Sequence, residues 1–175
     1  MEPTKTTRGI SILEVIVLLA LLVGVGGVVV PLVAGSLEDS KLQRALSDAG
    51  RIGAAVRQFT RDVGFEPGTP GKNEGLTILF TSGKLPSEVP PGPRKRLADA
   101  LSREAIALEA AQEKWKGPYL GEVGTDPWGR AYVVVQGGPG EGEHVWILSA
   151  GANGRVETAE TQDAIGGDDI GIQLR

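Results

Sequence analysis

The C-terminal tail concentrates the side chains best suited to bind a hard metal ion. Calcium is bound by carboxylate and carbonyl oxygens on flexible, glycine-containing turns. From Arg155 to Asp169 there are two glycines and five carboxylates, and Arg155 is the one basic residue. The carboxylates are Glu157, Glu160, Asp163, Asp168 and Asp169. A calcium site is therefore one interpretation of the tail, and a solvated acidic loop without metal is the alternative.

Glu14 is a second residue with unusual chemistry. It lies at the edge of a long apolar run, and no basic residue occupies the four positions after it. A carboxylate at the apolar edge of a membrane helix costs roughly 2–3 kcal/mol, so it needs a role or a partner. We therefore treat Glu14 as a candidate functional residue.

The other reactive side chains form no catalytic signature. His144 is the single histidine, and Ser149 lacks the G-x-S-x-G surroundings of an activated serine. The absence of cysteine excludes disulfides, a thiol nucleophile and a lipidated cysteine. No phosphate-binding or dinucleotide-binding glycine motif occurs, and the net charge of −4 argues against a nucleic-acid surface. We expect a protein that is not an enzyme.

An apolar segment near the N-terminus is long enough to anchor the chain in a membrane. No charge occurs from Val15 to Ser36, and about 20 apolar residues suffice for a helix to cross the bilayer. Lys5 and Arg8 precede the segment, which keeps the first residues in the cytoplasm and sends the rest outward. A cleaved signal peptide and a plain signal anchor are the alternatives.

Four helix-weakening residues interrupt this segment: Gly24, Gly26, Gly27 and Pro31. Glycine and proline weaken helices in water but are tolerated in the bilayer. Two interpretations stay open. The segment bends or partly unwinds when the chain leaves the membrane, or these are ordinary residues of a transmembrane helix.

The chain after the anchor predicts one long helix, from about 10 to about 63, and a small domain. An apolar stripe with spacings of three and four supports the second half of that helix: Leu42, Ala45, Leu46, Ala49, Ile52, Val56, Phe59 and Val63. A short helix is expected over 73–83, and another helix over about 94–114. Residues 131–136 and 144–149 predict an antiparallel hairpin, and the residues 126–129 predict a turn.

The N-terminal residues resemble the processing motif of type IV prepilins. That motif has a basic leader, a glycine, an apolar first mature residue and a glutamate four residues further on, which Gly9, Ile10 and Glu14 match here. The resemblance implies that a prepilin peptidase cuts after Gly9 and methylates the amine of Ile10. It also implies that Glu14 pairs with that amine on a neighbouring subunit.

Motifs of the C-terminal half are similar to the major pseudopilin of type II secretion. They are Lys114-Trp115-Lys116-Gly117-Pro118-Tyr119-Leu120, Asp126-Pro127-Trp128-Gly129, Ser149-Ala150-Gly151-Ala152-Asn153-Gly154 and Asp168-Asp169-Ile170. The resemblance implies a calcium-binding loop, with Asn153 in place of the usual aspartate and Asp168 or Asp169 as the closing ligand. Asp163 is a possible substitute ligand. The helix over about 94–114 and the proline-rich loop before it are longer than the family usually has.

The resemblance implies an α+β, pilin-like fold: a long N-terminal helix, transmembrane in its first half, packed on a small antiparallel sheet. The expected parts are a cleaved leader (1–9), a transmembrane and assembly segment (10–36) and a periplasmic domain (37–175). The expected function is a structural subunit of the filament, the pseudopilus, that drives protein export across the outer membrane. The implied partners are further copies in a helical filament, the bacterial inner membrane, the peptidase, minor pseudopilins and the inner-membrane assembly platform. A type IV or competence pilus subunit and a membrane-anchored, calcium-dependent binding module are the alternatives.

Overall fold

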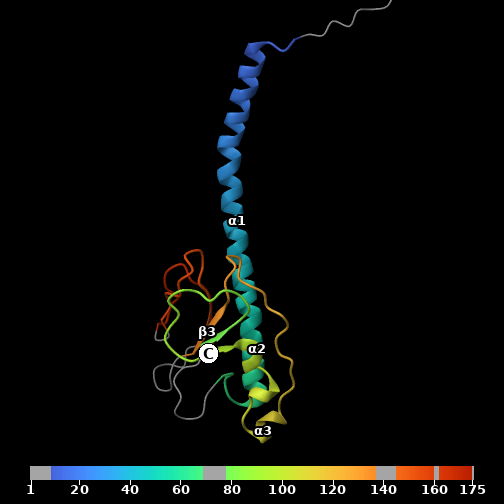
Figure 1. Cartoon of the computed structure of the whole chain (residues 1–175), viewed down its shortest axis with the longest axis vertical. Coiled ribbons are helices and arrows are strands. Elements are labelled where there is room, and N and C mark those ends of the chain that lie inside the picture. The colour runs from blue at the N-terminus through green and yellow to red at the C-terminus, as the bar shows by residue number, and fades with distance from the viewer. Residues whose placement is uncertain (1–8, 69–77, 137–144, 160–161, 175) are drawn as a thin grey trace, which may run out of the picture. The chain divides into compact units, whose positions relative to one another are not determined.

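The computed structural model describes residues 9–68, 78–136, 145–159 and 162–174, and of residues 25–35 only the backbone. It is an α+β protein that divides into two units, Met1–Ser40 and Lys41–Arg175. Helix α1 (Ile12–Val63) begins in the first unit and ends in the second (Figure 1). The expectation of one long N-terminal helix is confirmed. The predictions for Gly26, Gly27 and Pro31 go beyond the backbone, which is all that the structure describes there. His144 also lies outside the described residues.

The part of α1 in the second unit buries one face. Ala45, Ala49, Ile52, Val56, Phe59 and Val63 are buried, as the stripe predicts. Leu42 and Leu46 were expected in the same stripe, but they are 40% and 42% exposed. The expectation was wrong for these two residues. Leu42 precedes Ala45, where the described core begins, and Leu46 lies beside the buried face that Ala45 and Ala49 form.

The sheet has five strands in the order β2-β1-β3-β4-β5. They are β1 (Ile78–Phe80), β2 (Arg94–Arg96), β3 (Val133–Gln136), β4 (Val145–Ser149) and β5 (Ile170–Leu174). The predicted hairpin is confirmed by the antiparallel pairing of β3 with β4. The sheet is not wholly antiparallel, because β1 and β2 run parallel.

Both faces of the sheet are apolar. Leu79, Val134 and Ile147 belong to the core shared with α1, while Val133, Val135 and Trp146 belong to a second cluster on the other face. Because successive strand residues point to opposite faces, β3 buries apolar side chains on both. The second cluster is completed by residues after β4, including Ala150 and Val156.

The two helices predicted after α1 differ from the structure: the first is absent from the described residues, and the second is broken into short elements. Residues 78–80 form β1 instead of a helix, since they pair with both β2 and β3. The helix expected over about 94–114 is broken into β2, α2 (Leu97–Ala100), a 3₁₀ turn η1 (Arg103–Ala105) and α3 (Glu109–Gln112).

Side chains satisfy the carbonyls that the broken helix leaves free. The Trp115 indole N–H donates to the Leu101 carbonyl at 3.0 Å, and the Gln112 amide donates to the Ile106 carbonyl at 2.6 Å. Buried carbonyl groups need such partners outside regular helices. The segment is nevertheless part of the core, because Leu97, Leu101 and Ile106 are buried. It is therefore an integral part of the domain.

Candidate functional site

The predicted processing and assembly residues lie at the start of α1. Gly9 and Ile10 precede the helix, and the Ile10 side chain is 74% exposed. Glu14 lies exposed in the first helical turn, where a negative charge is favoured by the helix dipole. Within the described residues, Glu14 forms no ion pair and no side-chain hydrogen bond in its own chain.

The first turns of α1 carry uncovered apolar side chains. Large apolar residues from Ile12 to Val23 are all at least 43% exposed. An apolar surface of this extent needs lipid or another protein surface to cover it. Among the residues that could be searched, no helix is long and apolar enough to cross a membrane.

The predicted metal ligands are spread over the loop between β4 and β5. The Asn153 amide N–H donates to Asp168 Oδ2 at 2.9 Å, so these two residues are in contact. Asn153 Oδ1 accepts the Arg155 amide N–H at 2.7 Å, which leaves that oxygen already engaged. Asp163 lies on the exposed part of the loop.

Asp169 is the most buried of the predicted ligands, with 7% of its surface exposed. Its Oδ2 accepts the backbone N–H groups of Glu157 and Thr158 and the Thr158 hydroxyl, at 2.7–2.8 Å. Burial raises the pKa of Asp169 above its ordinary value, although these hydrogen bonds act in the opposite direction. This carboxylate therefore holds the two sides of the loop together.

Glu157 is a residue of this loop that the predicted ligand set lacks. Its Oε2 accepts the Asn153 side-chain amide at 3.0 Å and the Asp168 backbone N–H at 3.2 Å. Gly167 has φ 58°, and a β-carbon there would overlap the Glu157 carboxylate. Sequence showed the acidic side chain but not this position, because the contact depends on how the loop closes.

Two oxygens in the loop could serve a cation. Within the described residues, Asp168 Oδ1 and Asp169 Oδ1 are buried without a hydrogen-bond partner. Unpartnered carboxylate oxygens are the hard donors that calcium prefers, so the donor chemistry fits. No group of three or more His, Cys, Asp or Glu placed to hold a metal occurs among the described residues. The calcium site stays a prediction.

The loop is attached to the segment before β2. The Ser87 backbone N–H and its hydroxyl both donate to the Gly154 carbonyl at 2.9 Å. The Arg155 guanidinium donates to Glu88 Oε2 at 2.5–2.9 Å. These contacts position the turn around Asn153 against residues far away in sequence.

The predicted turn at 126–129 is confirmed, and it contacts the start of the loop at the end of β4. Asp126 is buried and accepts the Trp128 and Arg130 N–H groups and, at 2.6 Å, the Ser149 hydroxyl. The Arg130 guanidinium donates to the Gly151 carbonyl at 2.9 Å. Ser149 therefore has a structural partner at the end of β4.

The described architecture defines a class: an α+β protein with one long N-terminal helix, exposed apolar residues at the start of that helix, and a small sheet domain. The profile of the family "Type II secretion system (T2SS), protein G" matches residues 84–168.

Curated relatives extend the match over most of the chain. Type II secretion system core protein G of Escherichia coli (strain K12) is 29% identical over 160 residues, which covers 91% of this chain and 92% of that protein. The protein of the same name from Pectobacterium carotovorum subsp. carotovorum is 28% identical, covering 87% and 81%. The one from Vibrio cholerae serotype O1 is 25% identical, covering 89% and 87%. No solved structure matches significantly.

The resemblance predicted from the motifs is confirmed by these matches. The chain is similar, over most of its length, to proteins named type II secretion system core protein G, and these matches support a pseudopilin role.

Proposed function

We propose that this protein is the repeating, non-enzymatic subunit of a type II secretion pseudopilus, anchored in the bacterial inner membrane before assembly. The observation that carries the proposal is the uncovered apolar start of α1 with Glu14 in its first turn. A filament whose central helices cover one another removes this surface from water. The similarity to proteins named type II secretion system core protein G, which extends over most of their length, supports the proposal.

Processing creates the partner that Glu14 lacks. Cleavage after Gly9 by a prepilin peptidase frees the amine of Ile10, which is then methylated. In an apolar environment, two opposite charges in contact offset part of each other's desolvation cost, whereas a single unpaired charge keeps the full cost. The Glu14 carboxylate of one subunit pairs with the Ile10 amine of the next, and this favours one axial register.

The filament grows in the periplasm from subunits held by their apolar segment, with residues 37–175 outside the cytoplasm. Its growth from the inner-membrane assembly platform, together with minor pseudopilins, moves exported proteins across the outer membrane. Nucleic acid has no part in this function.

The test of the proposal is the Glu14→Ala variant of the full chain, expressed in a bacterium with the secretion machinery. We expect intact-mass measurement to show cleavage after Gly9 in the variant and in the original chain. Imaging should show few or no filaments from the variant. Asp39→Ala, which removes an exposed carboxylate beyond the apolar segment, is the control and should assemble normally. Normal filaments from Glu14→Ala would sink the proposed pairing.

We also propose that the loop from Gly151 to Asp169 binds calcium. Asp168 Oδ1 and Asp169 Oδ1 are the donors that lack hydrogen-bond partners among the described residues. Asn153 and Asp163 are the further ligands implied by the resemblance, and Glu157 lies in contact with Asn153. A bound cation neutralises carboxylates that otherwise repel one another.

Calorimetric titration of the purified chain with calcium tests this site. We expect binding and an increase of the melting temperature, both lost in Asp168→Asn, since one hard charged ligand is removed. Glu113→Gln alters an exposed acid outside the loop and should bind calcium as the original chain does. No heat of binding and no thermal shift on chelation would rule the site out.

A further inference from the structure

The edge strand β2 presents three consecutive cations. Arg94, Lys95 and Arg96 are all exposed, and none forms an ion pair among the described residues. β2 pairs only with β1, at one end of the sheet order. Charges on an edge strand oppose strand-to-strand pairing, so a partner here is recognised by side chains.

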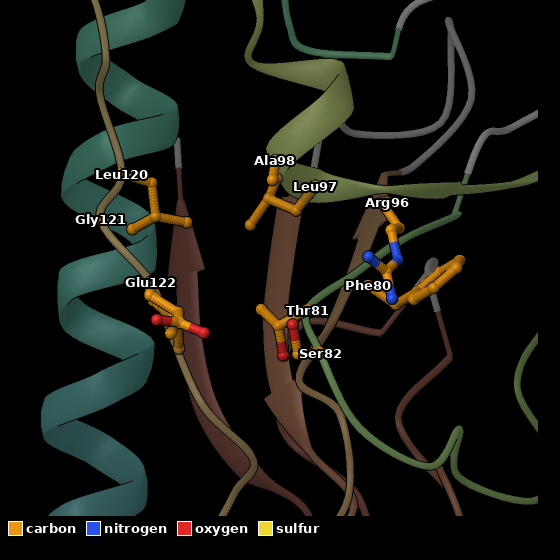
Figure 2. A pocket seen from close by; sticks show the side chains of 10 residues that line it. Phe80, Thr81, Ser82, Arg96, Leu97, Ala98, Leu120, Gly121 and Glu122 are labelled. Atoms are coloured by element: carbon orange, nitrogen blue, oxygen red, sulfur yellow. The ribbon is translucent and has the colours of Figure 1, made fainter.

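A pocket lies beside this strand. It has a volume of about 100 Å³, and its walls include Arg96, Leu97, Leu120 and Glu122. Figure 2 shows Leu120 and Glu122 on one side, Arg96 on the other, and Leu97 between them. A cavity of about 150 Å³ holds benzene, so this one has room for a branched aliphatic side chain.

An apolar side chain flanked by acids lies elsewhere on the same unit. Leu108, directly before α3, is 64% exposed, more than any other large apolar residue described in Lys41–Arg175. Glu104 and Glu109 are exposed on either side of it in sequence. Neither glutamate forms an ion pair among the described residues.

We propose that these two surfaces dock between copies of the chain: Leu108 of one copy enters the β2 pocket of the next. Glu104 and Glu109 then face Arg94 and Arg96 around the apolar contact. An apolar anchor surrounded by a charged rim is the usual arrangement of a protein interface. The proposal deepens the proposed function, on which it rests, by naming a contact between globular domains.

The second copy is the occupant that charge complementarity favours. The chain is acidic overall, with a net charge of −4, and it contains both the cationic edge and the acidic surface that matches it. The two surfaces differ, so the contact joins unlike patches of two copies. Such heterologous contacts repeat into rings or open helical filaments, not closed two-fold dimers.

Mixing two single-cysteine variants tests the contact, because the natural chain has no cysteine. One full-length copy carries Ala107→Cys, at an exposed position directly beside the intact Leu108, and the other carries Glu122→Cys. The two copies have different tags and are co-expressed in a bacterium with the secretion machinery. We expect oxidation to give a mixed dimer containing both tags. Replacing Glu122→Cys with Ala54→Cys, at an exposed position on α1, is the matched control and should give no mixed dimer.

Charge reversal identifies what holds the contact. The double change Arg94→Glu with Arg96→Glu in the Glu122→Cys copy should lower the mixed dimer about tenfold or more, as loss of interface anchors does. Adding Glu104→Arg and Glu109→Arg to the Ala107→Cys copy should restore the mixed dimer. If Arg94 and Arg96 served only to fold their own chain, changes in the other copy would not restore the mixed dimer.

The outcomes separate this inference from the proposed function. Filaments without the mixed dimer would overturn the docking contact alone, whereas the absence of any assembly would overturn both. An equal yield of mixed dimer with and without the charge reversal would show that Arg94 and Arg96 do not hold the contact. Flotation of the chain with vesicles of anionic phospholipid, lost on reversal while the mixed dimer persists, would assign the basic edge to a membrane surface instead.

Discussion

Tyr132 joins β3 to helix α1 through a polar contact in the core. Its ring is fully buried, and its hydroxyl donates to Asp48 Oδ2 at 3.2 Å. Arg51 also contacts Asp48, at 3.2 Å. Burial, and then the Asp48 carboxylate, raise the pKa of Tyr132 above its ordinary value.

Tyr132→Phe should change the pH dependence of stability. The unfolded phenol ionises near pH 10, while the folded one stays neutral to higher pH, so this residue stabilises the fold below about pH 10 and loses that contribution as pH rises further. At pH 7 the variant should lose about 1 kcal/mol with the hydrogen bond.

Denaturant unfolding at pH 7 and pH 11 measures both effects. The stability difference between the two proteins should shrink or change sign at the higher pH. Tyr119→Phe is the comparison: burial also raises the pKa of Tyr119, but this residue is only partly buried, so its stability difference should change less between the two pH values. If the stability difference between the original chain and Tyr132→Phe were the same at pH 7 and pH 11, ionisation of Tyr132 would not cause the loss of stability at alkaline pH.

At the scale of elements, Gly53 sets how closely α1 approaches the sheet. A β-carbon at this position would lie 2.7 Å from Ile172 Cδ1 and 3.0 Å from Leu174 Cδ2. Gly50, one turn earlier on the same helix, has nothing within 4 Å of that position. The two glycines have the same helix propensity but different surroundings.

Alanine at these two positions should therefore act in opposite directions. Gly50→Ala should stabilise by up to about 1 kcal/mol, through helix propensity. Gly53→Ala should destabilise by about 1–2 kcal/mol, because β5 side chains must shift. Thermal or urea unfolding measures both, and a stabilising Gly53→Ala would show that the helix and β5 separate without penalty.

At the scale of the whole molecule, the core of the second unit is complete without the first. The buried hydrophobic residues begin at Ala45, and the two units divide after Ser40. The residues of α1 that fold into the core thus follow Ser40, whereas the proposed assembly contacts lie before it.

A chain beginning at Lys41 should fold but should not form filaments. Its melting temperature should lie within about 5 °C of that of the full chain in detergent, because every buried hydrophobic residue that the structure describes is kept. Calorimetry and filament imaging measure the two properties. Unfolding of the shortened chain would mean that the first 40 residues stabilise the domain.

The sequence predicted those elements whose signal is local. The stripe from Ala45 to Val63, the β3–β4 hairpin and the turn at Asp126 follow from side-chain period and turn chemistry. The prepilin-like motif around Glu14 and the C-terminal motifs also predicted the pseudopilin relationship that the comparisons confirm.

Only the tertiary structure decided how short apolar runs pair and how the acidic loop closes. Ile78–Phe80 is a strand because β2 and β3 lie beside it, and three residues carry too little periodicity to show this. Glu157 reaches Asn153 and Asp168 because the loop folds back on itself. Local residue types thus determined which groups this protein has, while contacts distant in sequence determined which of them meet.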